Sequence, residues 1–294
     1  MAEPINLEIK NFEDLQRIII LLDNETPNQN GYILDLSNYI SFIRPLFIVT
    51  IAQFVRLYRS KNYNIHKLKL SSNRSASNEY LKSLDFEERF YNNFDNSDTF
   101  ACPSSSLPIT PVSYEEIPNK KIKIVNFLKN KGFKKDFTFL EVCLDEILNN
   151  CFDHAKSVTG VIAHAQYFDS INTIKLAICD TGIGVPHSIN NYLKLLNKEL
   201  LSSEEAIKWA FTRNNTTKSN PRNKGLGLNT LLSATNSSKG EFRMITLDKW
   251  IINTPSIEFR MRDTKAFFGT AIEIEIKIDN LYEIELDDFS FDDF

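Results

Sequence analysis

The first part of the chain mixes segments that alternate apolar and polar residues with segments that are almost wholly apolar. Three short segments follow a strand pattern: residues 5–10, 31–36 and 66–71. Two segments follow a helical pattern: residues 45–59, which open with Pro45 in a favourable first-turn position, and residues 78–84. We therefore predict a small α/β domain over residues 1–100.

A proline-rich stretch follows this predicted domain. Four prolines and a run of serines occur between residues 97 and 118, and both residue types favour turns and loops. We therefore predict a linker over residues 101–115, leading to a second domain.

The second predicted domain, residues 116–280, keeps its helices and strands apart. Helices are expected over residues 119–131, 136–156 and 225–235, and strands over residues 158–168, 173–179 and within 240–278. Residues 185–224 have some helical character but end in a polar, basic stretch, where a mobile loop is expected. This segregation predicts an α+β sandwich with helices on one face of a mixed sheet.

Composition narrows the class of protein. Hydrophobic residues make up 42% and charged residues 24% of the 294 residues, as in ordinary soluble globular proteins. The net charge of −4 provides no basic field for nucleic acid, and no apolar stretch is long enough to span a membrane. The N-terminus lacks the pattern of a secretory signal, so a cytoplasmic location is expected. Six of the last twelve residues are acidic, and we predict an acidic tail over residues 281–294.

The predicted helix 136–156 carries an unusual polar face. At 100° per residue, Asn150 and Asp153 lie within about 40° of Glu146, and Asn149 lies about 60° away. These side chains are carboxylates and amides with no cation between them, and such oxygen ligands suit Mg²⁺ and a water molecule. Apolar side chains, among them Leu144, Ile147, Leu148 and Cys151, fall on the opposite arc. An ordinary amphipathic helix also fits this pattern, so the helix alone does not identify a site.

Three glycine-containing motifs follow this helix. Asp180, Gly182 and Gly184 come after a predicted strand, where the glycines let backbone approach a ligand and the carboxylate needs a donor. A helix start that can bind phosphate follows, together with nearby lysines: Lys218, Lys224, Gly225, Leu226, Gly227 and Leu228. Gly269 precedes Thr270, whose hydroxyl could bridge Asp180 and a base edge. A tight turn, an ordinary helix start and a strand threonine would each explain one motif.

Taken together and in this order, the four motifs resemble those of the GHKL ATPases. This superfamily has a Bergerat-type ATP-binding fold and includes DNA gyrase, histidine kinases and anti-sigma-factor kinases. The matching residues are Glu146 and Asn150 in the N box, Asp180, Gly182 and Gly184 in the first glycine box, Gly225 and Gly227 in the second, and the late pair Gly269 and Thr270. The resemblance covers roughly residues 116–280 and implies a Bergerat-fold α/β sandwich.

The resemblance also implies roles for individual residues. Asn150 would bind Mg²⁺, Asp180 would accept the amino proton of adenine, and Glu146 would be the catalytic general base. Residues 185–224 would form the lid over ATP. The nucleotide-binding set that it implies is Asn150, Asp153, Asp180, Gly182, Gly184, Lys218, Lys224, Gly225, Leu226, Gly227, Leu228 and Thr270.

The order of elements in residues 1–100 resembles a STAS domain, as in antagonists of anti-sigma factors. In that family the phosphorylated serine lies in an Asp-Ser-Ser-Gly-like loop, whereas the equivalent here runs from Ser41 to Pro45 and reads SFIRP. This departure argues against regulation by phosphorylation and leaves partner binding open. A different small α/β domain also fits the pattern.

Three functions follow from these resemblances. We favour a signalling ATPase switch; the alternatives are a serine/threonine kinase of the anti-sigma type and a module that holds ATP without turnover. A histidine kinase is disfavoured because the only histidine before the N box is His66, at the start of a predicted strand. A gyrase-type enzyme is disfavoured because its transducer domain has no counterpart here. The expected ligands are ATP, Mg²⁺ and a protein partner bound through residues 1–100 or the acidic tail, and a homodimer is compatible with this interpretation.

Overall fold

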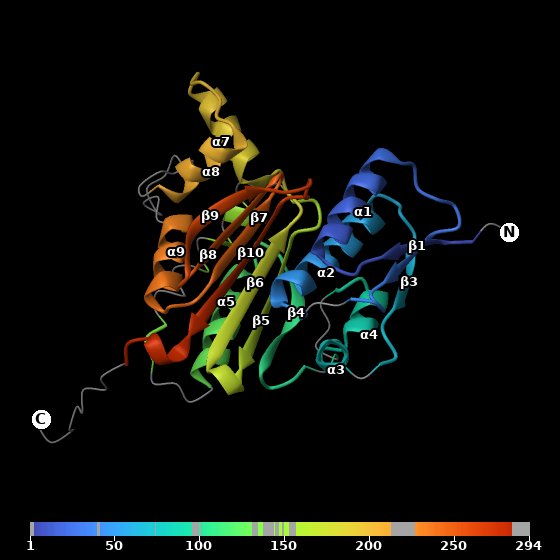
Figure 1. Ribbon diagram of the computed structural model, residues 1–294, viewed down its shortest axis with the longest axis horizontal. Helices are drawn as coiled ribbons and strands as arrows, with labels where there is room; N and C mark the ends of the chain where they lie inside the picture. Colours follow the sequence, from blue (N-terminus) through green and yellow to red (C-terminus); the bar gives the residue numbers. More distant parts are fainter. Residues whose placement is uncertain are drawn as a thin grey trace, which may run out of the picture.

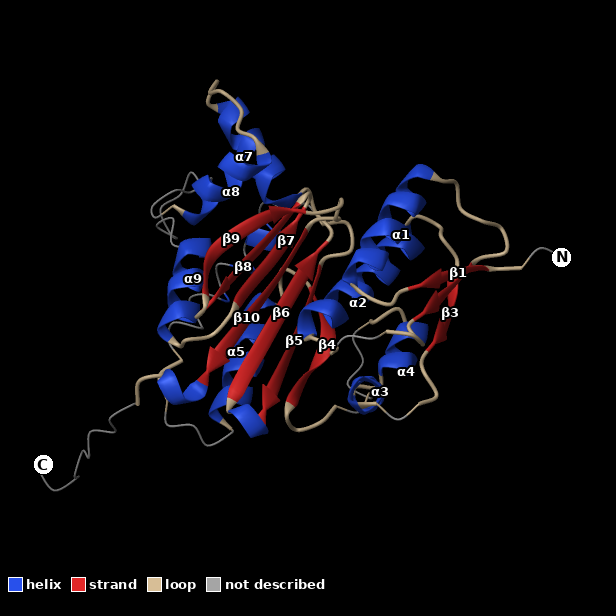
Figure 2. Ribbon diagram, in the orientation of Figure 1, coloured by secondary structure: helices blue, strands red, loops and turns tan. Residues whose placement is uncertain are grey.

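The computed structural model describes residues 3–39, 42–73, 75–95, 100, 102–130, 135–137, 144, 147–148, 150–152, 157–212 and 227–283. These residues form an α+β structure with two sheets, as expected from the sequence (Figures 1 and 2). One sheet has three parallel strands, and the other has seven antiparallel strands.

The N-terminal part builds the three-stranded sheet. Its elements are β1 (Ile5–Glu8), α1 (Phe12–Asn24), β2 (Tyr32–Asp35), α2 (Pro45–Ser60), β3 (Ile65–Lys69), α3 (Ala76–Ser83) and α4 (Phe86–Tyr91). Helix α1 is absent from the sequence-based prediction. It connects two neighbouring parallel strands, which need a long crossover. Asn11 caps it by accepting hydrogen bonds from the backbone of Glu13 at 2.8 Å and Asp14 at 3.1 Å.

The remaining elements build the larger sheet and its helices. They are β4 (Ser106–Val112), α5 (Ile117–Lys129), β5 (Val161–Phe168), β6 (Thr173–Asp180), α7 (Gly184–Leu195), α8 (Ser203–Phe211), α9 (Gly227–Ser237), β7 (Phe242–Thr246), β8 (Lys249–Thr254), β9 (Ile257–Asp263) and β10 (Thr270–Lys277). The strand order is β4-β5-β6-β10-β7-β8-β9, and every neighbouring pair is antiparallel. The prediction of a mixed sheet is therefore wrong, because short turns join β5 to β6 and β7 through β9, and such turns reverse the chain.

Strand β4 occupies the middle of the predicted linker 101–115. It pairs with β5 at the edge of the sheet, and the register shifts between Leu107 and Thr110, where Pro108 lies. Proline is tolerated at sheet edges and irregularities because it has no ladder hydrogen to donate. Two of the prolines that suggested a linker, Pro108 and Pro111, instead belong to an edge strand.

Helices α5, α8 and α9 of the second predicted domain pack on one face of the seven-stranded sheet, as predicted, and α2 of the N-terminal part covers the other face. Alternate strand residues pack against α5, α8, α9 and the helical residues near position 148; we call this side the helix-layer face. The opposite side packs against α2, and we call it the α2 face. Its buried residues are Ile162, Ala177, Cys179, Ile245 and Ala271. Because these residues share one apolar cluster with the N-terminal helices and strands, the two parts of the chain share a core.

Polar contacts also join α2 to the larger sheet. The fully buried Gln53 amide donates to the carbonyl oxygens of Gly160 and Cys179, each at 2.9 Å. At the start of the helix, the Arg44 guanidinium donates to Glu273 on β10 at 2.6 and 2.8 Å, and the Leu46 backbone amide donates to the same carboxylate at 2.9 Å. The Glu273 side chain is only 1% exposed, so this ion pair lies within the contact between α2 and the sheet.

Helices α7 and α8 form a hairpin that projects beyond one end of the larger sheet (Figure 1). A small apolar cluster of its own, centred on Ile189, Leu193 and Ala206, holds the two helices together. Ser202 and Glu205 form a capping box at the start of α8, which satisfies backbone N–H groups there. The hairpin covers the first part of the predicted lid 185–224; residues 213–226 lie outside the described residues.

Candidate functional site

Asp180 ends strand β6 at the centre of the seven-stranded sheet. Its neighbour across the ladder is Thr270, the first residue of β10. The side chain is buried, with the residue only 2% exposed, and it lies on the helix-layer face next to Cys151. The preceding residue, Cys179, lies on the α2 face. The two motifs that the sequence placed ninety residues apart therefore meet at one end of adjacent strands.

The Asp180 carboxylate is surrounded by hydrogen-bond donors. The backbone amide of Gly182 donates to Oδ1 at 2.8 Å, and the Thr270 backbone amide and the Cys151 thiol also contact the carboxylate. Burial raises the pKa of Asp180 to about 6, although these three donors act in the opposite direction. Burial and the neighbouring carboxylate raise the pKa of the Cys151 thiol, which keeps it protonated as a donor. A carboxylate in this setting can accept a further N–H from a ligand.

Two glycines allow the chain to close around Asp180. Gly269 has φ of +64°, and a Cβ built on it would lie 2.7 Å from both Asp180 Oδ1 and the Gly182 nitrogen. Gly184 has φ of +76°, and its Cβ would lie 2.9 Å from Thr246 Oγ1. Both positions therefore need glycine for conformation and for space.

Thr270 contacts Asp180 through its backbone and not through its hydroxyl. Its Oγ1 lies 3.1 Å from Thr246 Oγ1 on β7, while its backbone amide reaches the carboxylate. Thr246 Oγ1 also accepts from the backbone amide of Val185 at 3.0 Å. The two hydroxyls thus tie β10, β7 and the first turn of α7 together at the base of the projecting hairpin.

The helix of the predicted N box lies beside Asp180. Its apolar arc is buried as expected, with Leu144, Ile147, Leu148 and Cys151 in the core. Asn150 is half-buried and immediately precedes Cys151, whose thiol contacts Asp180. Glu146 and Asp153 lie outside the described residues, so their positions relative to Asn150 stay predictions.

The second glycine motif is described only at its end. Gly227 begins α9, and the half-buried Leu228 packs against the core of the helix-layer face. Asn229 Nδ2 donates to the Phe211 carbonyl oxygen at 2.9 Å and so joins the start of α9 to the end of α8. The remaining predicted residues of this motif lie outside the described residues: Lys218, Lys224, Gly225 and Leu226.

Sequence reasoning did not find Cys151 or Thr246 as parts of the site. Cys151 was placed on the apolar arc of its helix, and only the structure reveals that its thiol reaches Asp180. Thr246 stands in a strand without a motif around it, so no sequence signal marks it. Gly184 is the one indirect indication of Thr246, because the missing Cβ of this glycine leaves room for the Thr246 hydroxyl.

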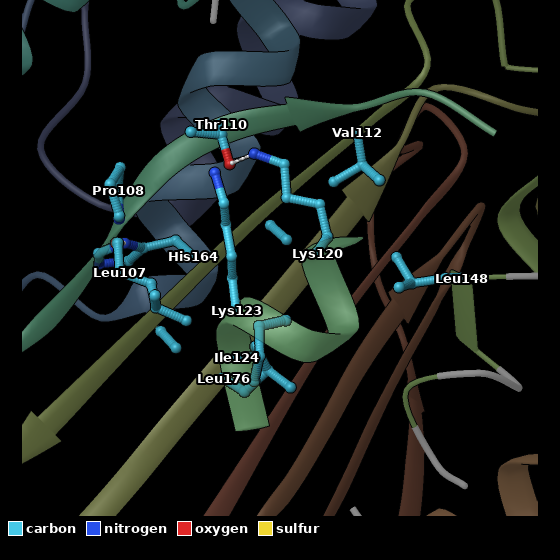
Figure 3. A pocket seen from close by; sticks show the side chains of 12 residues that line it. Leu107, Pro108, Thr110, Val112, Lys120, Lys123, Ile124, Leu148, His164 and Leu176 are labelled. Atoms are coloured by element: carbon cyan, nitrogen blue, oxygen red, sulfur yellow. Dashed lines mark hydrogen bonds between the residues drawn. The ribbon is translucent and has the colours of Figure 1, made fainter. Parts of the chain in front are cut away.

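A small pocket lies elsewhere on the helix-layer face. It has a volume of about 60 Å³ and opens between β4 and α5 (Figure 3). Its position does not coincide with Asp180, Gly184 or Thr270. The buried environment of Asp180 is a stronger indication of a binding site than this small pocket, because a buried carboxylate needs donors.

Within the described ranges, no three His, Cys, Asp or Glu side chains gather into a metal-binding group, and no helix has the length and apolarity to cross a bilayer. The candidate site consists of Asp180, the glycines around it and the helix of Asn150. Comparison of the sequence with models of known protein families found no match, and comparison with curated proteins found none either.

Proposed function

We propose that this chain is a Mg·ATP-binding protein of the GHKL type that acts as a regulatory ATPase switch. One observation carries the proposal: Asp180 is buried at the end of β6, paired with Thr270 and enclosed by Gly182 and Gly269. The antiparallel order of β5, β6, β10 and β7, with the helix of Asn150 over Asp180, supports a Bergerat-type arrangement of these elements.

In this proposal Asp180 accepts a hydrogen bond from the amino group of adenine. Asn150 would hold Mg²⁺ through its side-chain oxygen, and bound Mg²⁺ would neutralise charge on the phosphates. Glu146 would orient the attacking water as general base, and Lys218 and Lys224 would add positive charge near the phosphates. Asn150 is half-buried and directly precedes Cys151, whose thiol contacts Asp180, and this supports a ligand position near that carboxylate.

The N-terminal part would serve as the partner-binding domain, similar to a STAS domain. Its contact with the larger sheet favours an ATPase over a kinase that phosphorylates its own N-terminal loop. Arg44 and Leu46 hold the start of α2 to Glu273 on the α2 face, whereas Asp180 lies on the helix-layer face. Ser37 Oγ donates to Asp35 Oδ1 at 2.5 Å, so that hydroxyl is already engaged.

We predict that the chain does not phosphorylate itself stoichiometrically. The serines near the loop, Ser37 and Ser41, precede a helix on the far side of the sheet from the proposed site. Incubation with ATP and Mg²⁺, followed by intact mass measurement, should give free phosphate and an unchanged mass. Complete addition of one phosphoryl group at Ser37 or Ser41 would instead make the kinase the primary function.

We predict that Glu146→Ala retains nucleotide binding and loses turnover by about 100-fold or more, because a general base acts mainly on the transition state. Phosphate release and equilibrium binding of ATP would be measured in parallel. Asn150→Ala is the matched variant, and it should lose the Mg²⁺ dependence of binding. Normal turnover by Glu146→Ala would rule out this base, and absence of turnover in the unmodified chain would favour a module that only holds ATP.

A further inference from the structure

The pocket between β4 and α5 combines an apolar floor with cationic walls. Lys120 and Lys123 extend from α5 towards Thr110 on β4, and Lys120 Nζ donates to Thr110 Oγ1 at 2.8 Å (Figure 3). Apart from the buried His164, the floor and sides are apolar side chains: Leu107, Pro108, Val112, Ile124, Leu148, Ala163, Ala165 and Leu176. A volume of about 60 Å³ accommodates an apolar side chain better than a nucleotide. The fitting ligand is therefore an apolar group flanked by negative charge.

The charge around this pocket is positive overall. Lys120 and Lys123 stand at its mouth, and α5 also carries Lys121 and Lys129. The Glu116 carboxylate accepts from the Ser113 backbone amide at 2.9 Å and is also attracted to Lys120 and Lys123, so it offsets part of the charge of the four lysines on α5. Carboxylates placed against this positive rim would be attracted to it, whereas an uncharged apolar peptide would gain nothing from the lysines.

The end of the chain leaves the body close to the same helix. Glu283 forms an ion pair with Lys135 at 3.0 Å, and the backbone amide of Asp136 donates to the Tyr282 carbonyl oxygen at 2.9 Å. Leu281 packs against the core of the helix-layer face, to which the pocket-lining Ile124 and Leu148 also belong. The segment that follows α5 therefore already holds the first residues of the acidic tail.

The sequence beyond Glu283 has the composition that the pocket requires. Residues 284–294 read IELDDFSFDDF, in which Phe289, Phe291 and Phe294 alternate with aspartate pairs. Phe294 is eleven residues from Glu283, which allows a reach of about 38 Å. Lys135 is at most about 29 Å from Ile124, the distance for five helical steps followed by six fully extended ones. Phe294 can therefore reach the pocket.

We propose that residues 284–294 bind in cis between β4 and α5. The proposal rests on the apolar pocket and its lysines, on the contacts that hold the start of the tail, and on the length of chain that follows Glu283. A phenylalanine ring enters the pocket, and the flanking aspartates pair with Lys120 and Lys123. Leu148 lines the pocket two residues before Asn150, so a bound tail contacts the helix of the proposed Mg²⁺ ligand. The binding of the tail does not depend on the proposed ATPase activity.

Hydrogen exchange of the full chain tests this proposal. Amides of residues 284–294 should exchange several-fold more slowly in the unmodified chain than in a variant carrying Phe289→Ser, Phe291→Ser and Phe294→Ser. Protection of α5 should fall in the same variant, which changes no residue that contributes to the described fold. Ser290→Ala is the matched tail control and should leave both segments unchanged.

A second pair of variants tests the pocket side. Lys120→Ala with Lys123→Ala should release the tail, whereas Lys194→Ala with Lys198→Ala, at the far hairpin, should not. Tail amides that exchange at the rate of an unstructured peptide in the unmodified chain would overturn the proposal. Protection that disappears on dilution would also overturn it, because the occupant would then be the tail of a second copy. Equal loss of tail protection in both pairs of lysine variants would indicate general charge attraction and would also overturn the proposal.

Discussion

Asp180→Asn should weaken ATP binding by about tenfold to a hundredfold. The amide retains one acceptor oxygen but presents an N–H₂ group towards the amino group of adenine, so one buried hydrogen bond is lost and two donors face each other. A buried polar group left without its partner costs about 1–3 kcal/mol, which corresponds to this range of affinity. Calorimetric titration of both proteins with Mg·ATP measures the effect, and wild-type affinity in the variant would contradict the assignment.

The same substitution should stabilise the folded protein at neutral pH. Burial raises the pKa of Asp180 from its ordinary value of 3.8 to about 6. The stability contributed by the neutral carboxyl is therefore fully present below about pH 4 and is lost as the pH rises through 6. Above that pH the buried charge costs on the order of 3 kcal/mol, which the uncharged amide of the variant would avoid. We expect the variant to gain free energy of unfolding relative to wild type between pH 4 and 7.

The pH dependence of binding provides an independent check on Asp180. In the unmodified chain the affinity for ATP should fall below about pH 6, because protonation removes an acceptor from the carboxylate. The Asp180→Asn variant should lack this dependence, apart from any contribution of the phosphates themselves, which a titration with ADP would reveal. Stability that is independent of pH in both proteins would show that Asp180 is not buried as described.

Removal of residues 1–95 should prevent the rest of the chain from folding cooperatively. The deletion strips α2 from the α2 face and exposes apolar residues that are now fully buried, among them Ile162, Cys179 and Ala271. It also leaves the buried Glu273 without Arg44. We expect a fragment that aggregates or unfolds without a sigmoidal urea transition. A fragment with wild-type-like cooperative unfolding would mean that the two parts fold independently.

A graded version of this test uses a single residue. Gln53→Ala should lower the free energy of unfolding by about 2–4 kcal/mol, because it removes the two hydrogen bonds that the Gln53 amide donates to Gly160 and Cys179 and leaves a cavity in this buried contact. Arg17→Ala on the exposed side of α1 is the matched control and should change it by less than about 0.5 kcal/mol. Equal effects of the two substitutions would contradict a shared core.

The central strands and the convergence of two motifs could be predicted from the sequence. Asp180 and Thr270 were assigned to one site because the order of their motifs resembles that of the GHKL ATPases, and the sheet places the two residues opposite each other. Gly269, which precedes Thr270, has no Cβ, and this lets the backbone approach Asp180 closely. Asp180 contacts the backbone amide of Thr270 and not its hydroxyl. This contact depends on the twist and register of β10, which residue types do not specify.

Other features could not be predicted because their cause lies in tertiary packing. Strand β4 contains two prolines, and only its place at the sheet edge explains why they are tolerated. Helix α2 is buried at 13 of its 16 positions. Its apolar pattern indicates that the helix is surrounded by other elements, but the pattern does not indicate which sheet it packs against. By contrast, helix α1 was missed although its cap at Asn11 and its buried Leu15, Ile19 and Leu22 give a readable signal.

Direct comparison of ATP and GTP binding tests the central claim, which is recognition of adenine by Asp180. Titration of the unmodified chain with each nucleotide, in the presence of Mg²⁺, should give saturable binding of ATP and at least about tenfold weaker binding of GTP. Guanine presents a carbonyl oxygen where adenine has its amino group, so the buried carboxylate would face an acceptor. Equal affinities for the two nucleotides, or no binding of ATP, would contradict the account.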